Sequence, residues 1–170
     1  MTASETPTSF GYAATPLGRV LVVSTDTELV GLYFDAHEHT PEVHEAEAVD
    51  SAPLIAITAQ LDEYFRGERT AFDVPLRLDG TPFQRAVWSA LLEIPYGTTS
   101  TYAQIAGQLG NPRATRAVGA ANARNPISIV VPCHRLVGSG GGLTGYGWGL
   151  DRKRRLLELE GAIEPAVSLG

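Results

Sequence analysis

The segment TYAQIAGQLGNPRATRAVGAANA, residues 101–123, contains two helical patterns joined by a tight turn. Thr101 and Gln104 form a capping box at the start of the first pattern, and Gly110 ends it. An Asn-Pro pair starts the second helix, which we expect from about residue 113 to the end of the segment. Two short helices on a tight turn are typical of a helix-turn-helix, although an αα-hairpin packed against the rest of the chain would give the same pattern.

The second of these helices is expected to expose a face of small residues. Solvated helix faces normally carry lysine, glutamate and glutamine, whereas glycine and alanine beside an arginine let the backbone approach a narrow groove. The predicted exposed face consists of Arg116, Gly119, Ala120 and Ala123, and the predicted buried face consists of Ala114, Ala117, Val118 and Ala121.

A longer helix is predicted before this segment. Thr81 can cap it, a proline suits its first position, and Phe83, Val87 and Leu91 line one face. The sequence Pro95-Tyr96-Gly97 ends this helix. The second half of the chain is therefore predicted to be mainly helical.

The first half mixes strands with one helix. Two alternating runs joined by a Thr-Pro-Leu-Gly turn predict a hairpin, and a third run predicts another strand. Apolar residues from Leu54 to Phe65 recur at helical spacing, and Gly67 ends that helix before a short strand. The predicted fold class is α+β, with a small α/β domain followed by a mainly helical domain. The predicted strands are residues 10–14, 20–24, 29–34 and 72–76.

The acidic segment 36–52 lies between the third strand and the helix. It has no periodicity, so we expect an exposed connection. His37, His39 and His44 lie in it at a spacing that matches no metal site. We predict that the protein binds no metal.

The charge of the chain changes sign between its halves. Residues 1–79 carry 4 Lys and Arg against 14 Asp and Glu, whereas residues 80–170 carry 9 against 5. The second half can therefore attract a polyanion although the whole chain has a net charge of −6. We predict two domains with these bounds.

Apolar residues make up 44% of the chain, but no apolar run approaches the ~20 residues of a membrane-spanning helix. The polar start TASETPTS has neither the basic nor the apolar region of a secretion signal. We expect a cytoplasmic protein without a membrane partner.

The single cysteine of the chain, Cys133, follows an apolar run at residues 127–131 that is predicted to be a buried strand. One cysteine excludes an internal disulfide and a cysteine-rich zinc site. A lone cysteine after a buried strand is ordinarily an inert small apolar residue. His134 and Arg135 follow at once, however, and a histidine and a cation favour the thiolate that acts as a nucleophile.

The last helix, expected over about residues 151–160, carries an acid on its buried face. Leu156 and Leu157 define that face, and Glu160 lies four and three residues after them. The helix dipole disfavours an anion in the last turn, so we expect Glu160 to take a buried partner, for which His134 is the best candidate. The alternative is a frayed helix end with Glu160 in water.

The loop GSGGGLTGYGWG, residues 138–149, contains a formal G-x-G-x-x-G pattern. No helix opens directly on it, so a dinucleotide site is not predicted. We expect a pocket wall made of backbone groups, with Tyr146 and Trp148 as its only large side chains; alternatively, Trp148 packs outward on the loop.

These residues together resemble a known family, the O6-alkylguanine-DNA alkyltransferases (methylated-DNA-protein-cysteine methyltransferases). The resemblance rests on VPCHR at residues 131–135, RAVG at 116–119 and Asn125-Pro126, and it extends from about Phe10 to Gly161. It implies a ribonuclease-H-like first domain and a second domain whose helix-turn-helix binds the DNA minor groove. It also implies that the alkylated base is flipped out of the duplex into a pocket beside the cysteine.

The resemblance implies single-turnover transfer of an alkyl group from O6 of guanine in double-stranded DNA to the cysteine, without a cofactor or a metal. Cys133 would accept the group, His134 would act as its water-mediated base, Glu160 would orient His134, Asn125 would brace a hinge and Tyr102 would hydrogen-bond the guanine. The implied substrate pocket contains Leu136, Tyr146, Gly147, Trp148 and Asn122, and the implied DNA-binding residues are Arg116, Ala114, Thr115, Gly119 and Ala120.

Two pocket positions depart from the pattern of many members of the family. Asn122 stands where some relatives have an apolar residue, and Trp148 stands where many have a small one. These departures bear on the size of the adduct that fits. Because there is no second cysteine to accept the alkyl group, each molecule should react once; we expect a monomer that can cluster on DNA.

Two other functions use the same features. A thiol hydrolase would need a cysteine, a histidine and a glutamate, but would leave the smooth helix beside Arg116 without a purpose. A DNA-binding regulator or lesion-marking protein would need only the helix-turn-helix, and relatives of that kind lack the cysteine that this chain has at position 133.

Overall fold

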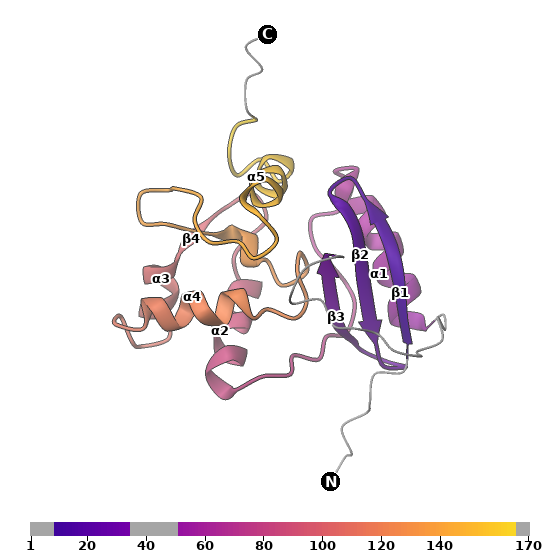
Figure 1. Ribbon diagram of the computed structural model, residues 1–170, viewed down its shortest axis with the longest axis horizontal. Helices are drawn as coiled ribbons and strands as arrows, with labels where there is room; N and C mark the ends of the chain where they lie inside the picture. Colours follow the sequence, from indigo (N-terminus) through magenta and orange to yellow (C-terminus); the bar gives the residue numbers. More distant parts are fainter. Residues whose placement is uncertain (1–8, 35–50, 166–170) are drawn as a thin grey trace. The chain divides into compact units, whose positions relative to one another are not determined.

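The computed structural model describes residues 9–34 and 51–165, and the chain divides into two compact units (Figure 1). The first unit contains the residues up to Asp79 together with Pro126–Val130, and the second contains Gly80–Asn125 and the chain from Val131 onward. The three histidines of the acidic connection lie outside the described residues.

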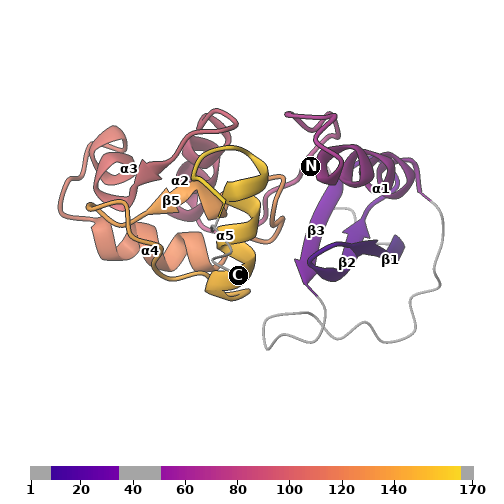
Figure 2. The ribbon, with the colours of Figure 1, turned by 90° about the horizontal axis from the view of Figure 1, so that it is seen from above.

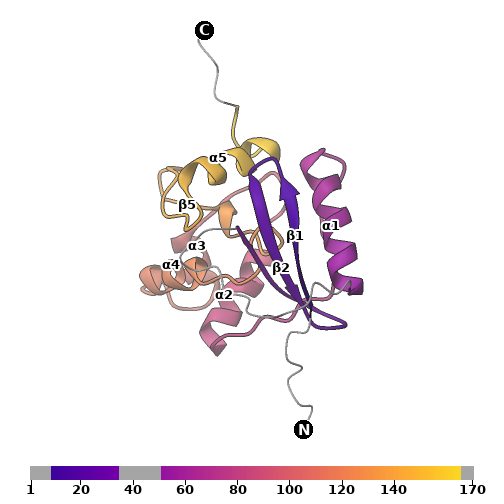
Figure 3. The ribbon, with the colours of Figure 1, turned by 45° about the vertical axis from the view of Figure 1, so that its right-hand side comes forward.

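The first unit is a three-stranded antiparallel sheet with one helix. Strands β1 (Ser9–Thr15), β2 (Gly18–Ser24) and β3 (Leu29–Phe34) pair in that order, so the predicted hairpin and third strand are confirmed. Helix α1 (Ala52–Phe65) contacts β1 and β2, and Figures 2 and 3 show it lying along the sheet.

Two predicted strands are absent from the described residues. Of residues 72–76, only Leu76 pairs, in an isolated bridge with Leu29. Of residues 127–131, only Ile127 pairs, with Leu32, and the chain then turns through Ile129, whose φ is +70°. Residues 127–131, which lie between two prolines, are nevertheless buried. Their apolar character therefore reflects burial, and not a ladder of hydrogen bonds to a neighbouring strand.

The second unit is mainly helical, as predicted. Thr81 and Thr101 each close a capping box, at the starts of α2 and α3, and Gly110 follows α3 with a φ of +77°. A parallel pairing of two residues with two, Ser100 with Leu136 and Thr101 with Val137, was not predicted. The elements are α2 (Pro82–Leu92), β4 (Ser100–Thr101), α3 (Tyr102–Gln108), α4 (Thr115–Ala123), the 3-10 turn η1 (Cys133–Arg135), β5 (Leu136–Val137) and α5 (Leu150–Leu159).

Three details of the helical prediction are wrong. Helix α4 begins at Thr115 rather than near residue 113, because Asn111 and Ala114 close a hydrogen-bonded turn first. Ala117 is exposed, whereas Val118 and Ala121 are buried as predicted. Phe83 is 36% exposed because the first turn of α2 extends beyond the core.

Helix α4 is fixed to α2 by a buried tryptophan. The indole Nε1 of Trp88 donates a hydrogen bond to the carbonyl of Ala121 at 2.8 Å, and both residues are buried. The opposite face of α4 carries Arg116, Ala120 and Ala123, which are exposed.

Among the described residues, no helix is both long and apolar enough to span a membrane.

Candidate active site

Cys133 begins the turn η1 and is 3% exposed. Its backbone N–H donates to the carbonyl of Val131 at 2.8 Å. The side-chain amide of Asn125, just after α4, donates to that same carbonyl at 2.7 Å. Asn125 thereby connects the end of α4 to the segment that carries the cysteine.

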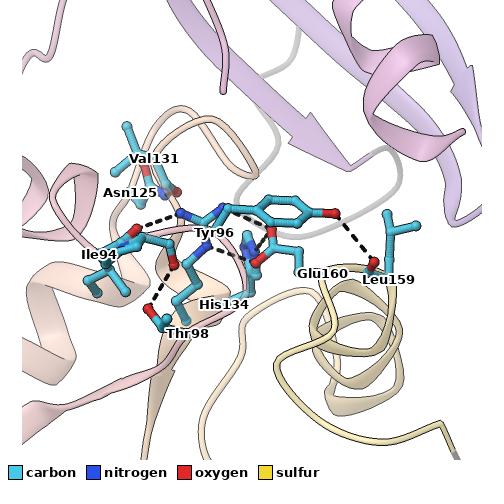
Figure 4. Close-up of polar contacts among 10 residues, drawn as sticks. Ile94, Tyr96, Thr98, Asn125, Val131, His134, Leu159 and Glu160 are labelled. Carbon is cyan, nitrogen blue, oxygen red and sulfur yellow. Dashed lines mark hydrogen bonds and ion pairs between the residues drawn. The ribbon is translucent and has the colours of Figure 1, made fainter. Parts of the chain in front are cut away.

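The carboxylate of Glu160, at the C-terminal cap of α5, collects three hydrogen bonds in a buried cluster (Figure 4). His134 Nε2 lies 2.9 Å from Oε2, as the helical spacing of Glu160 predicts. Arg135 donates from Nε to Oε1 at 2.8 Å and from Nη2 to Oε2 at 3.0 Å. Its Nη1 donates to the carbonyl of Ile94 at 2.7 Å, so the guanidinium is also anchored to the end of α2.

This arrangement fixes the state of the His134 ring. Burial lowers the pKa of His134 below its ordinary value of 6.5, although the Glu160 carboxylate opposes this effect. A neutral imidazole facing a carboxylate must donate from Nε2, which leaves the lone pair on Nδ1. Nδ1 is buried and has no hydrogen-bond partner among residues 9–34 and 51–165, so it is placed to accept a proton.

The lowered pKa of His134 predicts a loss of stability in acid. The unfolded imidazole takes up a proton near pH 6.5 and the folded one only at lower pH, so in that window the unfolded state binds more protons. The free energy of unfolding should fall by up to about 1.4 kcal/mol per pH unit below pH 6.5. Denaturant titrations at several pH values should show this additional fall in the free energy of unfolding for the parent and not for His134→Gln. The same dependence on pH in both proteins would contradict the prediction.

Burial raises the pKa of the Cys133 thiol above its ordinary value. Hydrogen bonds from Asn125 and Tyr146 and the positive charge of Lys153 act in the opposite direction. The resting group is therefore the thiol, and a nearby base is needed to produce the nucleophile.

Lys153 is a buried cation that the sequence interpretation missed. Its Nζ donates to the carbonyl of Leu136 and, at 2.8 Å, to the carbonyl of Thr144, and burial lowers its pKa to about 8. The sequence contained the signal, because Lys153 lies on the same helical face as Leu156, Leu157 and Glu160. Lys153 thus joins α5 both to β5 and to the glycine-rich loop.

Replacing Lys153 by methionine should loosen that loop. The buried carbonyl of Leu136 would lose its Lys153 donor, at about 1–3 kcal/mol for an unsatisfied group, whereas the carbonyl of the exposed residue Thr144 keeps its hydrogen bond from Tyr102. We expect the free energy of unfolding of Lys153→Met to fall by about 1–3 kcal/mol, with faster chymotrypsin cleavage within residues 138–149. Arg154→Met, which changes an exposed neighbour on α5, is the control. Equal stability and cleavage in the two variants would disprove this role.

An open groove of about 560 Å³ lies between the helix-turn-helix and the glycine-rich loop. The hydroxyl of Tyr102, the first residue of α3, donates to the carbonyl of Thr144 at 3.2 Å across it. A Cβ added at Gly119 would lie 3.9 Å from the Tyr102 ring, which shows how closely α4 approaches that ring. The lining residues are Tyr102, Thr115, Arg116, Gly119, Ala123, Thr144, Gly145, Tyr146 and Gly147.

The residues singled out by sequence fall into three sets. Cys133, His134, Glu160 and Asn125 are all buried near η1. A second set, consisting of Tyr102, Thr115, Arg116, Gly119, Tyr146 and Gly147, lines the groove. Ala114, Ala120, Leu136, Asn122 and Trp148 are not lining residues.

The sequence interpretation missed the second anchor of Glu160, which is Arg135, and the shared acceptor Thr144. The described part of the chain contains no group of three His, Cys, Asp or Glu side chains that could hold a metal ion.

Comparison with known families gives two matches that together span most of the chain. Residues 9–78 match the model "6-O-methylguanine DNA methyltransferase, ribonuclease-like domain", and residues 82–162 match "6-O-methylguanine DNA methyltransferase, DNA binding domain". The predicted order, a ribonuclease-like domain followed by a helical DNA-binding domain, is confirmed.

The chain is also similar to individual proteins and to a solved structure. A methylated-DNA–protein-cysteine methyltransferase of Methanosarcina acetivorans is 48% identical over 147 residues, which cover 86% of this chain and 94% of that protein. One from Mycobacterium tuberculosis is 62% identical over 107 residues, or 63% of this chain and 65% of that protein. The crystal structure of Mycobacterium tuberculosis OGT in complex with DNA has a TM-score of 0.83 and 45% identity, covering 93% of this chain and 96% of that one.

Proposed function

Because the chain belongs to the 6-O-methylguanine DNA methyltransferase family, we propose that it repairs alkylated DNA by direct reversal. The alkyl group on O6 of guanine in double-stranded DNA is transferred to Sγ of Cys133. The observation that carries this proposal is the buried set of Cys133, a neutral His134 with an open Nδ1, and the Glu160 carboxylate that holds the ring.

The transfer balances without a cofactor. The thiol proton passes through a water molecule to His134 Nδ1, and Sγ attacks the alkyl carbon. The bond between that carbon and O6 breaks and its electron pair stays on guanine. The base then takes a proton on N1 from water, and His134 returns the thiol proton to water, so the proton count is unchanged. The products are a Cys133 thioether and an unmodified guanine, and the single cysteine of the chain leaves no second thiol to accept the group.

The free energy needed to ionise the Cys133 thiol is small enough for a single base, His134, to supply. A free thiol with a pKa near 8.5 costs about 2 kcal/mol to ionise at neutral pH, and burial of Cys133 adds to that cost. The nucleophilicity of a thiolate falls as the pKa of its thiol falls, with a Brønsted slope of ~0.4–0.5. A thiol of high pKa that ionises only when the base acts therefore gives a reactive thiolate. Tyr102 lines the groove, and in this proposal its hydroxyl donates to the departing guanine in place of the carbonyl of Thr144 and stabilises the charge on the base.

The DNA-facing surface is the α3–α4 helix-turn-helix. Its exposed residues beside the groove are small apart from Arg116, which suits close approach to the minor groove. In this proposal the alkylated base is flipped into the groove, and Arg116 fills the space it leaves in the stack.

Arg116→Ala should separate base flipping from chemistry. Flipping a base costs a few kcal/mol of unstacking, which the arginine partly offsets, whereas a free base needs no flipping. Transfer from O6-methylguanine in duplex DNA should slow by about 10-fold or more while reaction with free O6-benzylguanine changes little. Arg113→Ala, exposed and outside the groove lining, is the matched control. Equal losses on both substrates would count against this role.

The division into domains 1–79 and 80–170, the cytoplasmic location and the monomeric state remain predictions.

Two other functions can be separated from repair by simple assays. A thiol hydrolase would turn over an activated ester many times, and a lesion-marking protein would bind the alkylated duplex without changing it.

The proposed function is tested by incubating the protein with duplex DNA that carries a radiolabelled methyl group on O6 of guanine. Label should move to protein and stop at one methyl per chain, leaving guanine in the DNA. Label that stays on the DNA, or a yield that keeps rising beyond one per chain, would contradict single-turnover repair.

A further inference from the structure

Strand β1 is an open edge of the sheet in the first unit (Figure 1). The chain itself covers the opposite edge, because β3 forms bridges with Leu76 and Ile127. Among residues 9–34 and 51–165, no segment pairs in this way with the outer side of β1. Natural proteins protect an exposed edge with charged residues, proline or a bulge. The sequence of β1 is SFGYAAT and its register with β2 is unbroken, so it has none of these protections.

The outer side of β1 presents a defined set of backbone groups. Thr15 and Gly18 close a two-residue turn as a hydrogen-bonded pair, and hydrogen-bonded pairs occur at every second position of an antiparallel ladder. The intervening residues Phe10, Tyr12 and Ala14 therefore direct their N–H and C=O groups away from β2. These groups can pair with an added strand without any change in the β1–β2 ladder.

A groove of about 580 Å³ lies beside this edge, between β1 and α1, and is called here the β1–α1 groove. Gly11 brings the two elements close together, since a Cβ at that position would lie 3.0 Å from Cδ2 of Leu54. Apolar side chains line most of the groove, and Ile55 is 59% exposed there. Asp62 is exposed and is the only charged residue of the lining.

We propose that this edge and groove bind an extended segment of a partner protein, which adds to the sheet as a strand antiparallel to β1. The backbone of β1 would supply hydrogen bonds, and the β1–α1 groove would take alternate apolar side chains of the segment. A strand rather than a helix is the occupant because unpaired N–H and C=O groups in a row complement another extended backbone. This proposal does not depend on the repair activity.

The direction of α1 determines where the segment should carry a charge. The hydroxyl of Ser51, which caps α1, lies 2.6 Å from that of Ser24, the partner of Ser9 in the sheet. Helix α1 therefore starts at the Ser9 end of β1 and runs along it, as Figure 3 shows, so that Asp62 lies toward the Thr15 end. An antiparallel segment has its N-terminal end there, and charge complementarity favours a lysine or arginine at that end.

A second copy of this chain is a poorer occupant. Antiparallel pairing of β1 with β1 of a copy creates a two-fold axis perpendicular to the joined sheet. The α1 helices of both copies would then lie on the same face of that sheet, and each would meet the other at the shared edge because α1 contacts β1. A single extended segment brings no helix with it.

The first test follows backbone amides of the full chain labelled with ¹⁵N. The probe is the acetylated and amidated peptide Lys-Thr-Val-Thr-Val-Thr-Val. It should slow exchange with solvent at the amides of Phe10, Tyr12 and Ala14, whereas Gly11 and Ala13, already paired with β2, should not change. No slowing at the first three amides would overturn the proposal. Slow exchange without peptide that is lost on dilution would show that a second copy occupies the edge, which would also overturn it.

A charge exchange tests the predicted orientation. The lysine peptide should bind about 5-fold more tightly than the same peptide with glutamate in place of lysine, as expected for an exposed ion pair. Asp62→Lys should reverse this preference, whereas Glu68→Lys, an exposed residue outside the groove lining, should keep it. The same preference in the parent and in Asp62→Lys would contradict the antiparallel placement.

A substitution in the wall of the β1–α1 groove tests whether the groove takes part. Ile55→Glu should weaken binding of both peptides by about 10-fold, because the contact with apolar side chains is lost and a carboxylate is partly covered. Ile55 is exposed, so the fold should not change. Leu92→Glu, at an exposed leucine of α2, is the matched control and should bind like the parent. Equal binding by Ile55→Glu and the parent would overturn the proposal.

Discussion

Cys133→Ser is expected to lose methyl transfer entirely, with a rate reduced by more than about 10⁴-fold. A serine hydroxyl is far less acidic than a thiol, so a neutral His134 cannot generate the alkoxide. DNA binding should persist, because Cys133 is buried and the exposed surface of α4 is unchanged. Transfer is followed with a labelled methyl group, and binding is followed by fluorescence anisotropy of an O6-methylguanine duplex.

The pairing of these two readouts makes the result decisive. A variant that binds the duplex with near-parent affinity but carries no label assigns the chemistry to Sγ. Label on the serine variant would place the acceptor elsewhere in the chain, and a loss of binding equal to the loss of transfer would indicate a folding defect.

Glu160→Gln should produce the second largest effect. The carboxylate is the common acceptor for His134 and Arg135, and the substitution leaves a nearly buried guanidinium without its counter-charge. Breaking a buried ion pair by removing one partner costs about 3–5 kcal/mol of folding free energy. The amide also no longer requires His134 to donate from Nε2, so transfer should slow by about 10²- to 10⁴-fold per folded molecule.

A pH profile distinguishes the role of Glu160 in orienting the base from a purely structural role. The variant should recover rate as pH rises, because the thiol then ionises without help from His134. Glu158→Gln, two residues earlier on α5, is the control for removing one negative charge from this helix. If the Glu160 variant matched that control in stability and rate at every pH, the proposed orienting role would be wrong.

Short-range sequence patterns correctly predicted the starts of two helices and the buried face of the last helix. The capping residues Thr81 and Thr101 mark real helix starts, and the spacing of Leu156, Leu157 and Glu160 places the carboxylate inside the unit. The same spacing includes Lys153, but burial of a lysine is costly and its two carbonyl acceptors come from β5 and from the glycine-rich loop. The partners of Lys153 depend on tertiary contacts that periodicity does not encode.

The wrong predictions also arise from contacts that local sequence patterns do not encode. An apolar run such as residues 127–131 indicates burial, but pairing requires a neighbouring strand with free backbone groups, and here only Ile127 finds one. The start of α4 shifted because a turn closed by Asn111 and Ala114 takes up the residues that follow the Asn-Pro pair. The groove could not be located from sequence because α3, α4 and the loop 138–149 form it together.

We propose that Cys133 itself accepts the alkyl group from guanine in DNA. Mass spectrometry of the intact protein after incubation with an O6-methylguanine duplex, followed by peptide mapping, tests it most directly. Every reactive molecule should gain a single CH₂, and the peptide containing Cys133 should carry it as S-methylcysteine. An unchanged mass in folded, DNA-bound protein, or a methyl group mapped to any other residue, would contradict it.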